Sequence, residues 1–267
     1  MDLHSHAADR LNPVALITGA ASGIGAALAH RLSPRATGGL ILIDQNERGL
    51  AKLADSLAEP PERVSTLAFD VADPERWARA GDFILDHYGR LDWAAANAGV
   101  AHAAAIADMS HDEWRRVLGV NLDGVFLTLK TAMPIMRLNQ QGGSIVVTAS
   151  ASGVKAEPNS AAYGASKAAA LHLTKVAARE GAPHRIRVNA IAPGGVETPM
   201  WRDQPFFQDL MREAGSERAA FDRLAADATP LGRYASADEV AELMEMLLCG
   251  ATPMTGATIV VDGGYTL

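Results

Sequence analysis

Short apolar runs alternate with longer amphipathic stretches along this chain. The runs are rich in aliphatic and β-branched residues, which is typical of buried strands, whereas the stretches repeat their apolar positions at helical spacing. The runs predict strands near residues 14–18, 39–43, 64–69, 92–96, 143–148, 186–190 and 257–261. The stretches predict helices near residues 23–33, 47–58, 74–89, 111–138, 161–181 and 236–249. This alternation predicts an α/β fold with one doubly wound sheet of about seven parallel strands, flanked by helices on both faces.

A glycine-rich turn joins the first predicted strand to the first predicted helix. The residues are Thr18-Gly19-Ala20-Ala21-Ser22-Gly23-Ile24-Gly25. Glycines let the chain turn tightly and let backbone N–H groups approach a pyrophosphate, which then rests at the positive end of the helix. The turn therefore predicts a dinucleotide site, with Gly19, Ser22, Gly23, Ile24 and Gly25 as candidate contacts.

An acidic residue follows the second predicted strand. Asp44 ends the run that begins at Leu40, about where dinucleotide folds place a carboxylate that accepts hydrogen bonds from the ribose hydroxyls. A carboxylate there would repel a 2′-phosphate, and neither Ser22 nor Gln45 supplies a compensating cation. The sequence therefore favours NAD over NADP. A solvated aspartate at a strand end is the alternative interpretation.

Three further residues predict acid–base chemistry. Tyr163 and Lys167 lie four residues apart in an Ala-rich stretch, so their side chains share one helix face. A free phenol titrates near pH ~10, and a nearby ammonium would lower that pKa enough for proton exchange with an alcohol near neutral pH. Ser150 ends the buried run that begins at Ser144, and ligands of open parallel sheets lie outside the carboxyl ends of the strands. A turn serine and a chance Tyr–Lys pair are the alternatives.

Taken together, these residues resemble the motifs of the short-chain dehydrogenase/reductase family, from about Val14 to Gly264. The resemblance implies a Rossmann-type fold in a single domain over residues 1–267, with a flexible segment at 1–12 and a substrate-binding flap at about 195–230. It also implies a catalytic tetrad of Asn121, Ser150, Tyr163 and Lys167. The remaining matches to the family's cofactor contacts are Asp70, Val71, Asn97, Ala98, Gly99, Pro193, Gly194, Val196 and Thr198. Thr148-Ala149 departs from the asparagine or serine common before the catalytic serine.

The resemblance implies hydride transfer between NAD(H) and a secondary alcohol or ketone, with no metal. Tyr163, as phenolate, would remove the hydroxyl proton while hydride leaves the same carbon for the nicotinamide. Ser150 would hold the substrate oxygen and Lys167 would bind the nicotinamide ribose and lower the pKa of the tyrosine. Asn121 would support a water-mediated proton path.

Two other functions fit the same motifs. A 3-oxoacyl thioester reductase, which acts on acyl carrier protein, shares the fold and the tetrad, but usually uses NADPH and carries basic residues near the glycine turn or the second strand. This chain has neither. A dinucleotide-binding scaffold without turnover would usually have lost a catalytic side chain, and all four are present here.

Composition narrows the possible partners. The 267 residues carry 24 basic and 31 acidic side chains, a net charge of −7, with no basic run, so nucleic acid is not expected. The chain has no run of about 18 apolar residues and no signal-peptide pattern at its start, which predicts a soluble, cytoplasmic protein without membrane contact. Its single cysteine, Cys249, excludes an internal disulfide. His4 and His6 lack neighbouring ligands, so no metal site is expected.

Two further segments predict assembly and substrate preference. The stretches 111–138 and 161–178 are apolar on more than one face, and the resemblance implies that such helices join subunits into a homotetramer. The segment 200–221 holds Trp201, Phe206, Phe207 and Phe221. We expect it to close over the substrate as an apolar flap, which favours an uncharged, moderately hydrophobic alcohol or ketone; ordinary core packing is the alternative.

Overall fold

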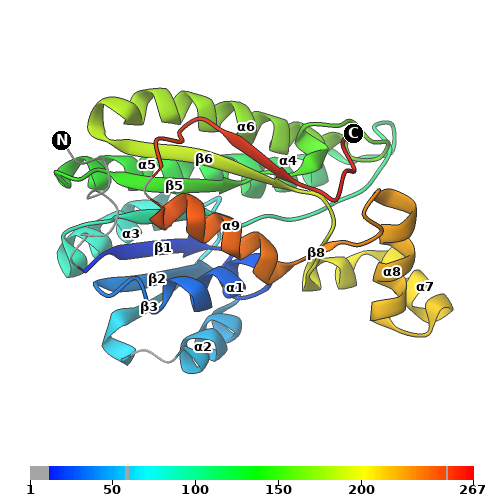
Figure 1. Ribbon diagram of the computed structural model, residues 1–267, viewed down its shortest axis with the longest axis horizontal. Coiled ribbons are helices and arrows are strands. Elements are labelled where there is room, and N and C mark those ends of the chain that lie inside the picture. Colours follow the sequence, from blue (N-terminus) through cyan, green and yellow to red (C-terminus); the bar gives the residue numbers. More distant parts are fainter. Residues whose placement is uncertain (1–11, 58–59, 251) are drawn as a thin grey trace.

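The computed structural model describes residues 12–57, 60–250 and 252–267, and its main feature is a seven-stranded parallel sheet (Figure 1). The strand order is β3-β2-β1-β4-β5-β6-β9, so chain order reverses between β1 and β4. The strands are β1 (Val14–Thr18), β2 (Gly39–Asp44), β3 (Val64–Ala68), β4 (Trp93–Ala96), β5 (Gly143–Thr148), β6 (Ile186–Pro193) and β9 (Thr258–Val261). The predicted fold class and all seven predicted strands are confirmed. His4, His6 and the predicted flexible segment, except Asn12, lie outside the described residues.

Alternate residues of each strand face two separate hydrophobic cores, because successive side chains of a strand point to opposite faces. In β1, Val14 and Leu16 belong to one core, whereas Ala15 and Ile17 belong to the other. The first core lies under α3 (Pro74–Tyr88), α5 (Gly124–Leu138) and α6 (Ala161–Gly181). The second lies under α1 (Gly23–Leu32), α2 (Glu47–Ser56) and α9 (Ala237–Cys249). Short 3₁₀ turns connect elements at η1 (Pro61–Arg63), η3 (Ala151–Gly153) and η4 (Ala182–His184).

The helix predicted over residues 111–138 is interrupted. It consists of α4 (His111–Leu118), a π-helical turn η2 (Gly119–Asp123) and α5. Apolar positions continue through the turn, so the sequence pattern does not reveal it. Such single π turns often mark functional sites, and this one carries Asn121.

The connection between β6 and α9 is more regular than predicted. The two-residue strands β7 (Val196–Glu197) and β8 (Ala235–Ser236) pair with each other, and η5 (Pro199–Asp203), α7 (Pro205–Ala214) and α8 (Glu217–Ala228) lie between them. We call residues 196–236 the α7–α8 segment. It projects from the end of the molecule where β1 ends, on the right in Figure 1.

Candidate active site

The predicted acid–base residues meet beyond the carboxyl end of β5. Ser150 follows that strand by two residues and is buried, and Tyr163 lies in the first turn of α6. The two side chains lie close enough for the Ser150 hydroxyl to lower the pKa of Tyr163. The backbone fixes Ser150 further, because its Oγ accepts from the Ser152 N–H at 3.1 Å and donates to the Pro193 carbonyl at 3.5 Å. The Ser150 hydroxyl and the Tyr163 phenol therefore lie together at the carboxyl edge of the sheet.

Lys167 lies one helical turn beyond Tyr163 and is 3% exposed. Its Nζ donates to the Thr148 carbonyl at 2.9 Å and lies 5.7 Å from the centroid of the Tyr163 ring. Burial lowers the pKa of Lys167 to about 8. The predicted nearness of the two side chains is confirmed.

The expected direction of the Tyr163 pKa shift is wrong for this structure. Burial raises the pKa of Tyr163, and the hydrogen bond to Ser150 offsets only part of that rise. The ammonium of Lys167 is directed at a carbonyl, so desolvation of the phenolate outweighs its attraction. Spacing along a helix predicts that two groups are close, but it does not report how much water they lose.

Asn121 joins two parts of the site. Its Oδ1 accepts from the Val100 N–H at 2.8 Å, and its Nδ2 donates to the Val100 carbonyl at 3.0 Å and to Ser166 Oγ at 3.2 Å. Ser166 in turn donates to the Tyr163 carbonyl at 2.7 Å. The π turn thus places a fully buried amide between the loop after β4 and the helix that carries Tyr163.

The glycine turn is held against the loop after β4. Gly19 has φ +64°, and a Cβ there would lie 2.8 Å from the Cα of Ala98. A Cβ on Gly25 would lie 2.1 Å from the Gly19 carbonyl oxygen. Asn97 Nδ2 donates to the Thr18 carbonyl at 3.1 Å, which closes this contact. Only glycine fits these two positions, as a turn packed closely around a phosphate requires.

The first turn of α1, like that of α6, lacks the side-chain cap that several other helices have. Asn46, Asp73, Ser110 and Ser236 cap α2, α3, α4 and α9 by accepting hydrogen bonds from backbone N–H groups. Ser22, the N-cap of α1, makes no such bond. Helix N-termini of this kind bind phosphate through N–H groups and the helix dipole. The geometry therefore fits the pyrophosphate of a dinucleotide.

Asp44 lies at the end of β2, beside the glycine turn. One carboxylate oxygen accepts from the Ala21 N–H at 3.0 Å and the other from the Asn46 N–H at 2.9 Å. A carboxylate has about four acceptor positions, so ribose hydroxyls could still bind it. Asp70 is exposed after β3, whereas Val71 is buried against the backbone at Gly124.

The remaining predicted cofactor residues lie around the same edge. A Cβ on Gly99 would lie 3.4 Å from both Asn121 Oδ1 and Lys167 Nζ. Pro193 ends β6, and the Gly194 N–H donates to the Val261 carbonyl at 2.9 Å. Val196 is buried in β7. The Thr198 side chain lies against the glycine turn, because a Cβ on Gly23 would be 3.3 Å from its Cγ2.

Two threonines that the sequence did not single out hold this arrangement together. Thr18 Oγ1 accepts from the backbone N–H groups of Asn97 and Ala98 at 2.9 and 3.1 Å. Thr148 Oγ1 donates to Asn97 Oδ1 at 3.0 Å. Each is the polar residue that ends a buried strand, which is the signal that could have identified it.

The aromatic residues of the α7–α8 segment pack on one another. Phe207, Phe221 and Tyr234 are buried, and the Trp201 ring lies within 5.7 to 6.1 Å of these three and of Phe206, between centroids. The side chains therefore form a small core of their own, as the alternative interpretation held. Phe206 is the exception, at 49% exposed.

His102 and Cys249 lie outside the hydrogen-bonded group. The Nε2 of His102 is 3.2 Å from Glu113 Oε1, at the start of α4. Cys249 is half-buried in the last turn of α9. Neither residue contacts Ser150 or Tyr163 in any interaction of the described chain, and we assign neither a chemical role.

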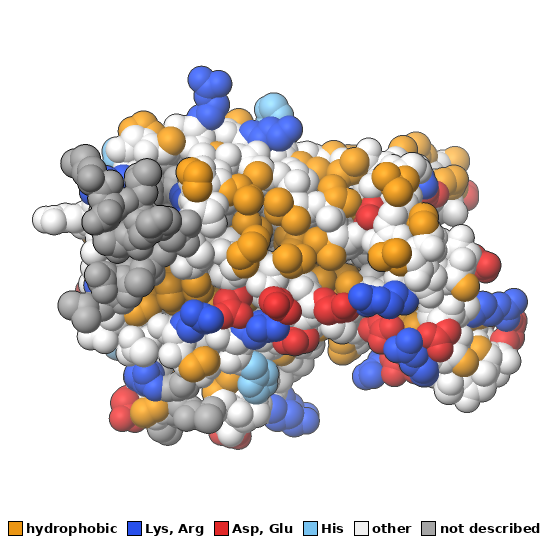
Figure 2. Space-filling view, viewed as in Figure 1, with side chains coloured by type: hydrophobic (Ala, Val, Ile, Leu, Met, Phe, Trp, Pro, Cys, Tyr) orange, Lys and Arg blue, Asp and Glu red, His pale blue; other side chains and the backbone are white. Residues whose placement is uncertain are grey.

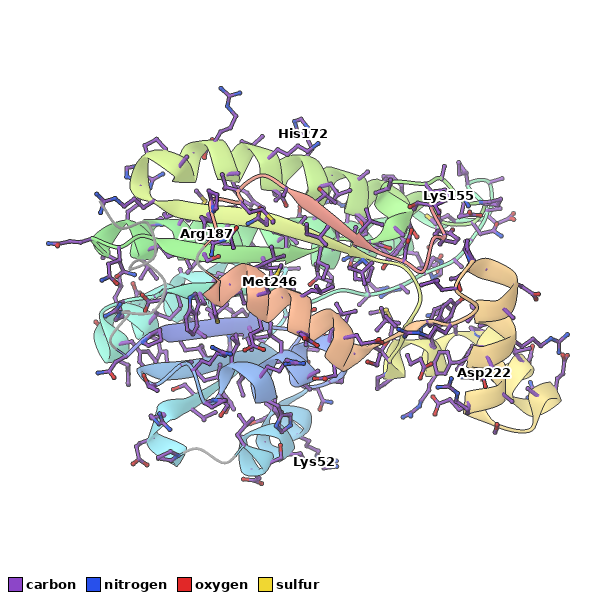
Figure 3. All side chains as sticks on the ribbon, viewed as in Figure 1. Lys52, Lys155, His172, Arg187, Asp222 and Met246 are labelled. Atoms are coloured by element: carbon purple, nitrogen blue, oxygen red, sulfur yellow. The ribbon has the colours of Figure 1, made fainter. Side chains whose placement is uncertain are left out.

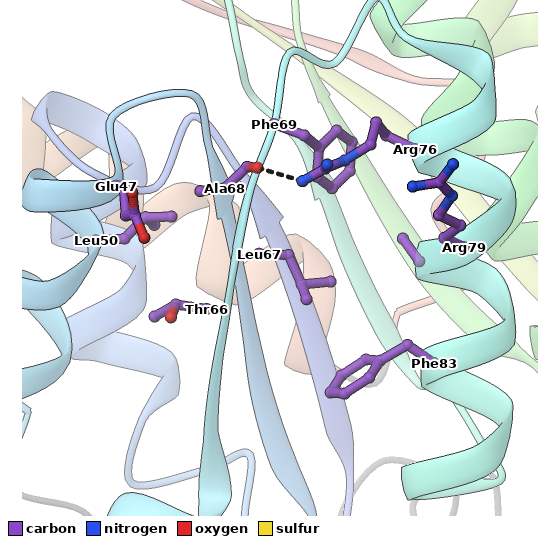
Figure 4. Close-up of a pocket in the computed structure, with 10 residues that line it drawn as sticks. Glu47, Leu50, Thr66, Leu67, Ala68, Phe69, Arg76, Arg79 and Phe83 are labelled. Carbon is purple, nitrogen blue, oxygen red and sulfur yellow. Dashed lines mark hydrogen bonds between the residues drawn. The ribbon is translucent and has the colours of Figure 1, made fainter.

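A cavity of about 510 Å³ lies beside β3, one of the two edge strands of the sheet (Figure 4). It is lined by side chains of α2, β3 and α3 and by none of the predicted site residues. Arg76 spans its upper end and donates to the Ala68 carbonyl at 2.7 Å. This bond covers a main-chain acceptor of the edge strand, which limits pairing with other chains.

Two features are absent from the described residues. No helix among them is long and apolar enough to cross a membrane. Within the same residues, no group of three or more His, Cys, Asp or Glu side chains is arranged to hold a metal ion.

Comparison with known proteins places the chain in a family. The family model described as enoyl-(acyl carrier protein) reductase matches residues 19–266. The chain is 34% identical to the 3-oxoacyl-[acyl-carrier-protein] reductase FabG of Thermotoga maritima, over 95% of this chain and 98% of the relative. It is 35% identical to trans-4-hydroxycyclohexanecarboxylate dehydrogenase of Sinomonas cyclohexanicum, over 98% of this chain and 96% of the relative.

Solved structures agree. A short-chain dehydrogenase/reductase of Brucella melitensis superposes with a TM-score of 0.82 at 32% identity, covering 96% of this chain and 97% of that one. A 3-ketoacyl-(acyl-carrier-protein) reductase of the same organism, complexed with NADH, gives 0.80 at 29% identity, covering 96% and 98%. The resemblance drawn from the sequence is confirmed along nearly the whole chain. This protein belongs to the short-chain dehydrogenase/reductase family of oxidoreductases.

Proposed function

We propose that this protein transfers hydride between NAD(H) and an uncharged, moderately hydrophobic secondary alcohol or ketone. The observation that carries the proposal is the pairing of the Ser150 hydroxyl with the Tyr163 phenol at one end of the sheet, with the buried ammonium of Lys167 behind the phenol ring. The pair lies where parallel sheets bind ligands, between the loop after β5 and the end of β6.

Each residue has a task in this reaction. In the oxidation direction, Tyr163 accepts the hydroxyl proton of the alcohol on its phenolate oxygen. Ser150 donates a hydrogen bond to the substrate oxygen and stabilises charge that develops there. The nicotinamide of NAD, held beside this pair by Lys167 and Thr198, would supply the acceptor for the hydride of the carbinol carbon. Reduction reverses each transfer, and the products of oxidation are the ketone, NADH and a proton.

The pKa shifts give this reaction a pH dependence. Burial raises the pKa of Tyr163, so the phenolate needed for oxidation becomes more populated as pH rises. The pKa of Lys167 is about 8, so this side chain carries its charge near neutral pH and loses it in more alkaline solution. The rate of oxidation should therefore rise above pH 7 and then fall at the more alkaline pH where Lys167 is neutral.

Asn121 holds α6 in register with the loop after β4 and supports the proton path.

The glycine turn and Asp44 support NAD as the cofactor. The family binds a nicotinamide dinucleotide, and the uncapped first turn of α1 offers N–H groups to its pyrophosphate. Asp44 is fixed by two backbone N–H groups, so its charge stays where a 2′-phosphate would lie. Lys167 would hold the nicotinamide ribose, and Thr198 would contact the carboxamide.

Charge pairing in the α7–α8 segment supports an uncharged substrate. All five arginines between residues 196 and 234 form ion pairs: Arg202 with Glu217, Arg212 with Asp209, Arg218 with Glu197, Arg223 with Glu213, and Arg233 with Glu239. Few cations of the segment are thus left for an anionic group. Met200 and Phe206 are 40% and 49% exposed there and offer apolar contact. The relative from Sinomonas, by contrast, is named for a carboxylate substrate.

A 3-oxoacyl thioester reductase is the second candidate. The matching family model and the relative from Thermotoga maritima favour it. NAD preference alone does not exclude this activity, since the similar reductase of Brucella melitensis was crystallised with NADH. Reduction of a 3-oxoacyl thioester at a rate above that of any simple ketone would favour it over our proposal.

We also propose a homotetramer. Phe126 on α5 and Val176 on α6 are exposed at 47% and 39%, on two of the helices expected to join subunits. Apolar side chains also gather over α9 and β9 (Figure 2), where Met246 and Val260 are 43% and 41% exposed. Closed tetramers with two-fold symmetry need at least two such surfaces. Light scattering should report about four times the 28.1 kDa chain mass.

The direct test is formation of NADH from NAD and a panel of secondary alcohols, followed by its absorbance. We expect turnover with cyclic or medium-chain secondary alcohols and little with polyols or phosphorylated sugars. NAD binding without turnover on any alcohol, ketone or thioester would instead indicate a dinucleotide-binding scaffold.

A further inference from the structure

The last six residues of the chain form a compact turn. The Asp262 carboxylate accepts hydrogen bonds from the N–H groups of Gly264 and Thr266 at 2.9 and 2.8 Å, and from Thr266 Oγ1 at 2.7 Å. Three bonds to one side chain fold the chain back on itself. We call residues 262–267 the C-terminal hook.

One side of the hook rests on the base of the α7–α8 segment. The Leu231 N–H donates to the Gly263 carbonyl at 3.1 Å. Gly264 has φ +90°, and a Cβ there would lie 2.9 Å from the Pro230 side chain. The backbone of the hook therefore packs directly on the residues that lead from α8 into β8.

The other side of the hook is bound by the loop between Ser150 and Tyr163. Lys155 Nζ donates to the Tyr265 carbonyl at 2.9 Å and lies 4.4 Å from the centroid of the Tyr265 ring. The Glu157 carboxylate is 3.7 Å from the same Nζ, and it also lies near enough to the Tyr265 hydroxyl to raise the pKa of that phenol. Figure 3 shows Lys155 beside the C-terminal end of the chain, above the α7–α8 segment.

The ammonium of Lys155 is thus already occupied. A carbonyl, an aromatic face and a carboxylate lie around it. This arrangement argues against direct binding of a substrate anion. It argues instead that Lys155 holds three segments together: the loop 151–160, the hook and the base of the α7–α8 segment.

We propose that Lys155 and Tyr265 are positioning residues that set the affinity of the enzyme for its alcohol substrate. Their contact holds the loop between Ser150 and Tyr163 against the C-terminal hook. The inference rests on the proposed function and names the residues that tune substrate binding at the same site.

The physical argument is one of populations. Val154, Ala156, Pro158 and Asn159 of the loop are exposed, so contacts such as those of Lys155 limit its motion. When the contact between Lys155 and Tyr265 is lost, only a fraction of the molecules hold the loop in the conformation that binds the alcohol. The apparent dissociation constant for the alcohol then rises by the inverse of that fraction. The bound state is unchanged, so kcat should stay the same. The affinity for NAD, which we assign to the glycine turn and Asp44, should also stay the same.

Lys155→Met and Tyr265→Ala, alone and together, test the proposal. Each single variant should raise KM for the alcohol about tenfold, with kcat within about twofold of wild type. Both changes remove the contact between the Lys155 ammonium and the Tyr265 ring, and Tyr265→Ala leaves only the bond of Lys155 to the main-chain carbonyl. The double variant should therefore also show about tenfold rather than about a hundredfold. Lys52→Met, which removes an exposed lysine on α2, is the control and should leave KM unchanged.

Hydrogen–deuterium exchange of residues 151–160 supplies a readout that does not need turnover. Exchange should be faster in both single variants and unchanged in Lys52→Met. Three outcomes would overturn the proposal. The first is an unchanged KM in an enzyme with wild-type turnover, and the second is a KM in the double variant that multiplies the two single effects. The third is a raised KM in Lys155→Met but not in Tyr265→Ala, which would indicate direct contact of Lys155 with the substrate. A parallel loss of kcat and NAD affinity would mean a general structural role. If the wild-type protein turns over no alcohol, the proposed function is wrong. If hydrogen–deuterium exchange of residues 151–160 is then the same in wild type and in the variants, this inference is wrong independently of the function.

Discussion

On the sheet side of the candidate site, hydrogen bonds to backbone atoms hold the residues, most of these bonds at least partly buried, whereas on the α7–α8 side exposed ion pairs and aromatic contacts hold the segment together. Asn97, Asn121 and Thr18 each bond to main-chain groups of a neighbouring element. Arg202 and Arg218 pair with acids while more than half exposed. Exposed pairs of this kind typically contribute less than about 1 kcal/mol.

This difference separates two tasks. Chemistry and cofactor binding need fixed distances, which buried backbone contacts supply at the edge of the sheet. Substrate choice tolerates a more loosely attached element, and the α7–α8 segment keeps its shape through its own small core. We therefore expect changes on the sheet side to alter rate and cofactor use, and changes on the other side to alter stability and KM.

The largest expected effect is on the sheet side. Tyr163→Phe keeps the ring and removes the hydroxyl that transfers the proton, so kcat should fall about 10³-fold while NAD still binds. Steady-state kinetics and NAD titration by fluorescence measure the two quantities. Tyr88→Phe removes a hydroxyl bonded to Ser65 near the edge of the sheet and is the matched control. A Tyr163→Phe variant with a tenth of wild-type kcat would contradict the assignment.

The aromatic core should be the sensitive point of the other side. Trp201→Ala removes a ring that contacts four others and a hydrogen bond from Nε1 to the Val196 carbonyl at 2.8 Å. The free energy of unfolding should fall by about 3 kcal/mol. Phe206→Ala should instead leave stability nearly unchanged and raise KM for hydrophobic alcohols, because this ring is exposed. Thermal melts and KM values for both variants decide the point. The reverse pattern would place the substrate against Trp201.

The buried Lys167 on the sheet side should make the free energy of unfolding depend on pH. The pKa of Lys167 is lowered to about 8 from 10.5, so the folded state binds fewer protons than the unfolded state between these values. The cost of burying its charge is fully present below pH 8 and disappears by about pH 10.5, and it amounts to roughly 3 kcal/mol. Relative to Lys167→Met, wild type should gain about that much stability between pH 7 and pH 10.5. A difference between the two proteins that does not change with pH would mean that folding leaves the pKa of Lys167 at its unfolded value, as for a solvated lysine.

Cofactor choice should depend on one charge. Wild type should prefer NAD over NADP by about 10²-fold in kcat/KM, which corresponds to about 2.7 kcal/mol. Asp44→Asn keeps an oxygen for the Ala21 N–H and removes the charge, so the preference should narrow to about tenfold, mainly through weaker NAD binding. Equal use of both cofactors by wild type would exclude Asp44 as the selecting residue.

The sequence predicted the sheet side better than the α7–α8 side. Strand positions follow from local apolar runs, and the glycine turn carries its own geometry, so these features were visible without the structure. The helices α7 and α8 were missed, although Gly215, with φ +81°, and the cap at Ser216 mark the boundary between them. Their aromatic residues looked like a flap because burial of Phe207 and Phe221 depends on each other and on Tyr234, which lies outside the segment considered.

Two errors on the sheet side have a common origin. The π turn at Asn121 is stabilised by Val100 and Ser166, which are 21 and 45 residues away. The raised pKa of Tyr163 follows from its burial in the folded chain. Periodicity and spacing report neighbours within one helix, so neither long-range contact nor loss of water could be derived from them.

Transfer of deuterium is the most direct test of the central claim. A secondary alcohol labelled with deuterium at the carbinol carbon should yield a ketone and NADH that carries one deuterium per turnover, measured by mass spectrometry of the cofactor. Tyr163→Phe should lose the product and the label together. Unlabelled NADH, or a labelled product that forms at the wild-type rate in Tyr163→Phe, would contradict the proposed mechanism.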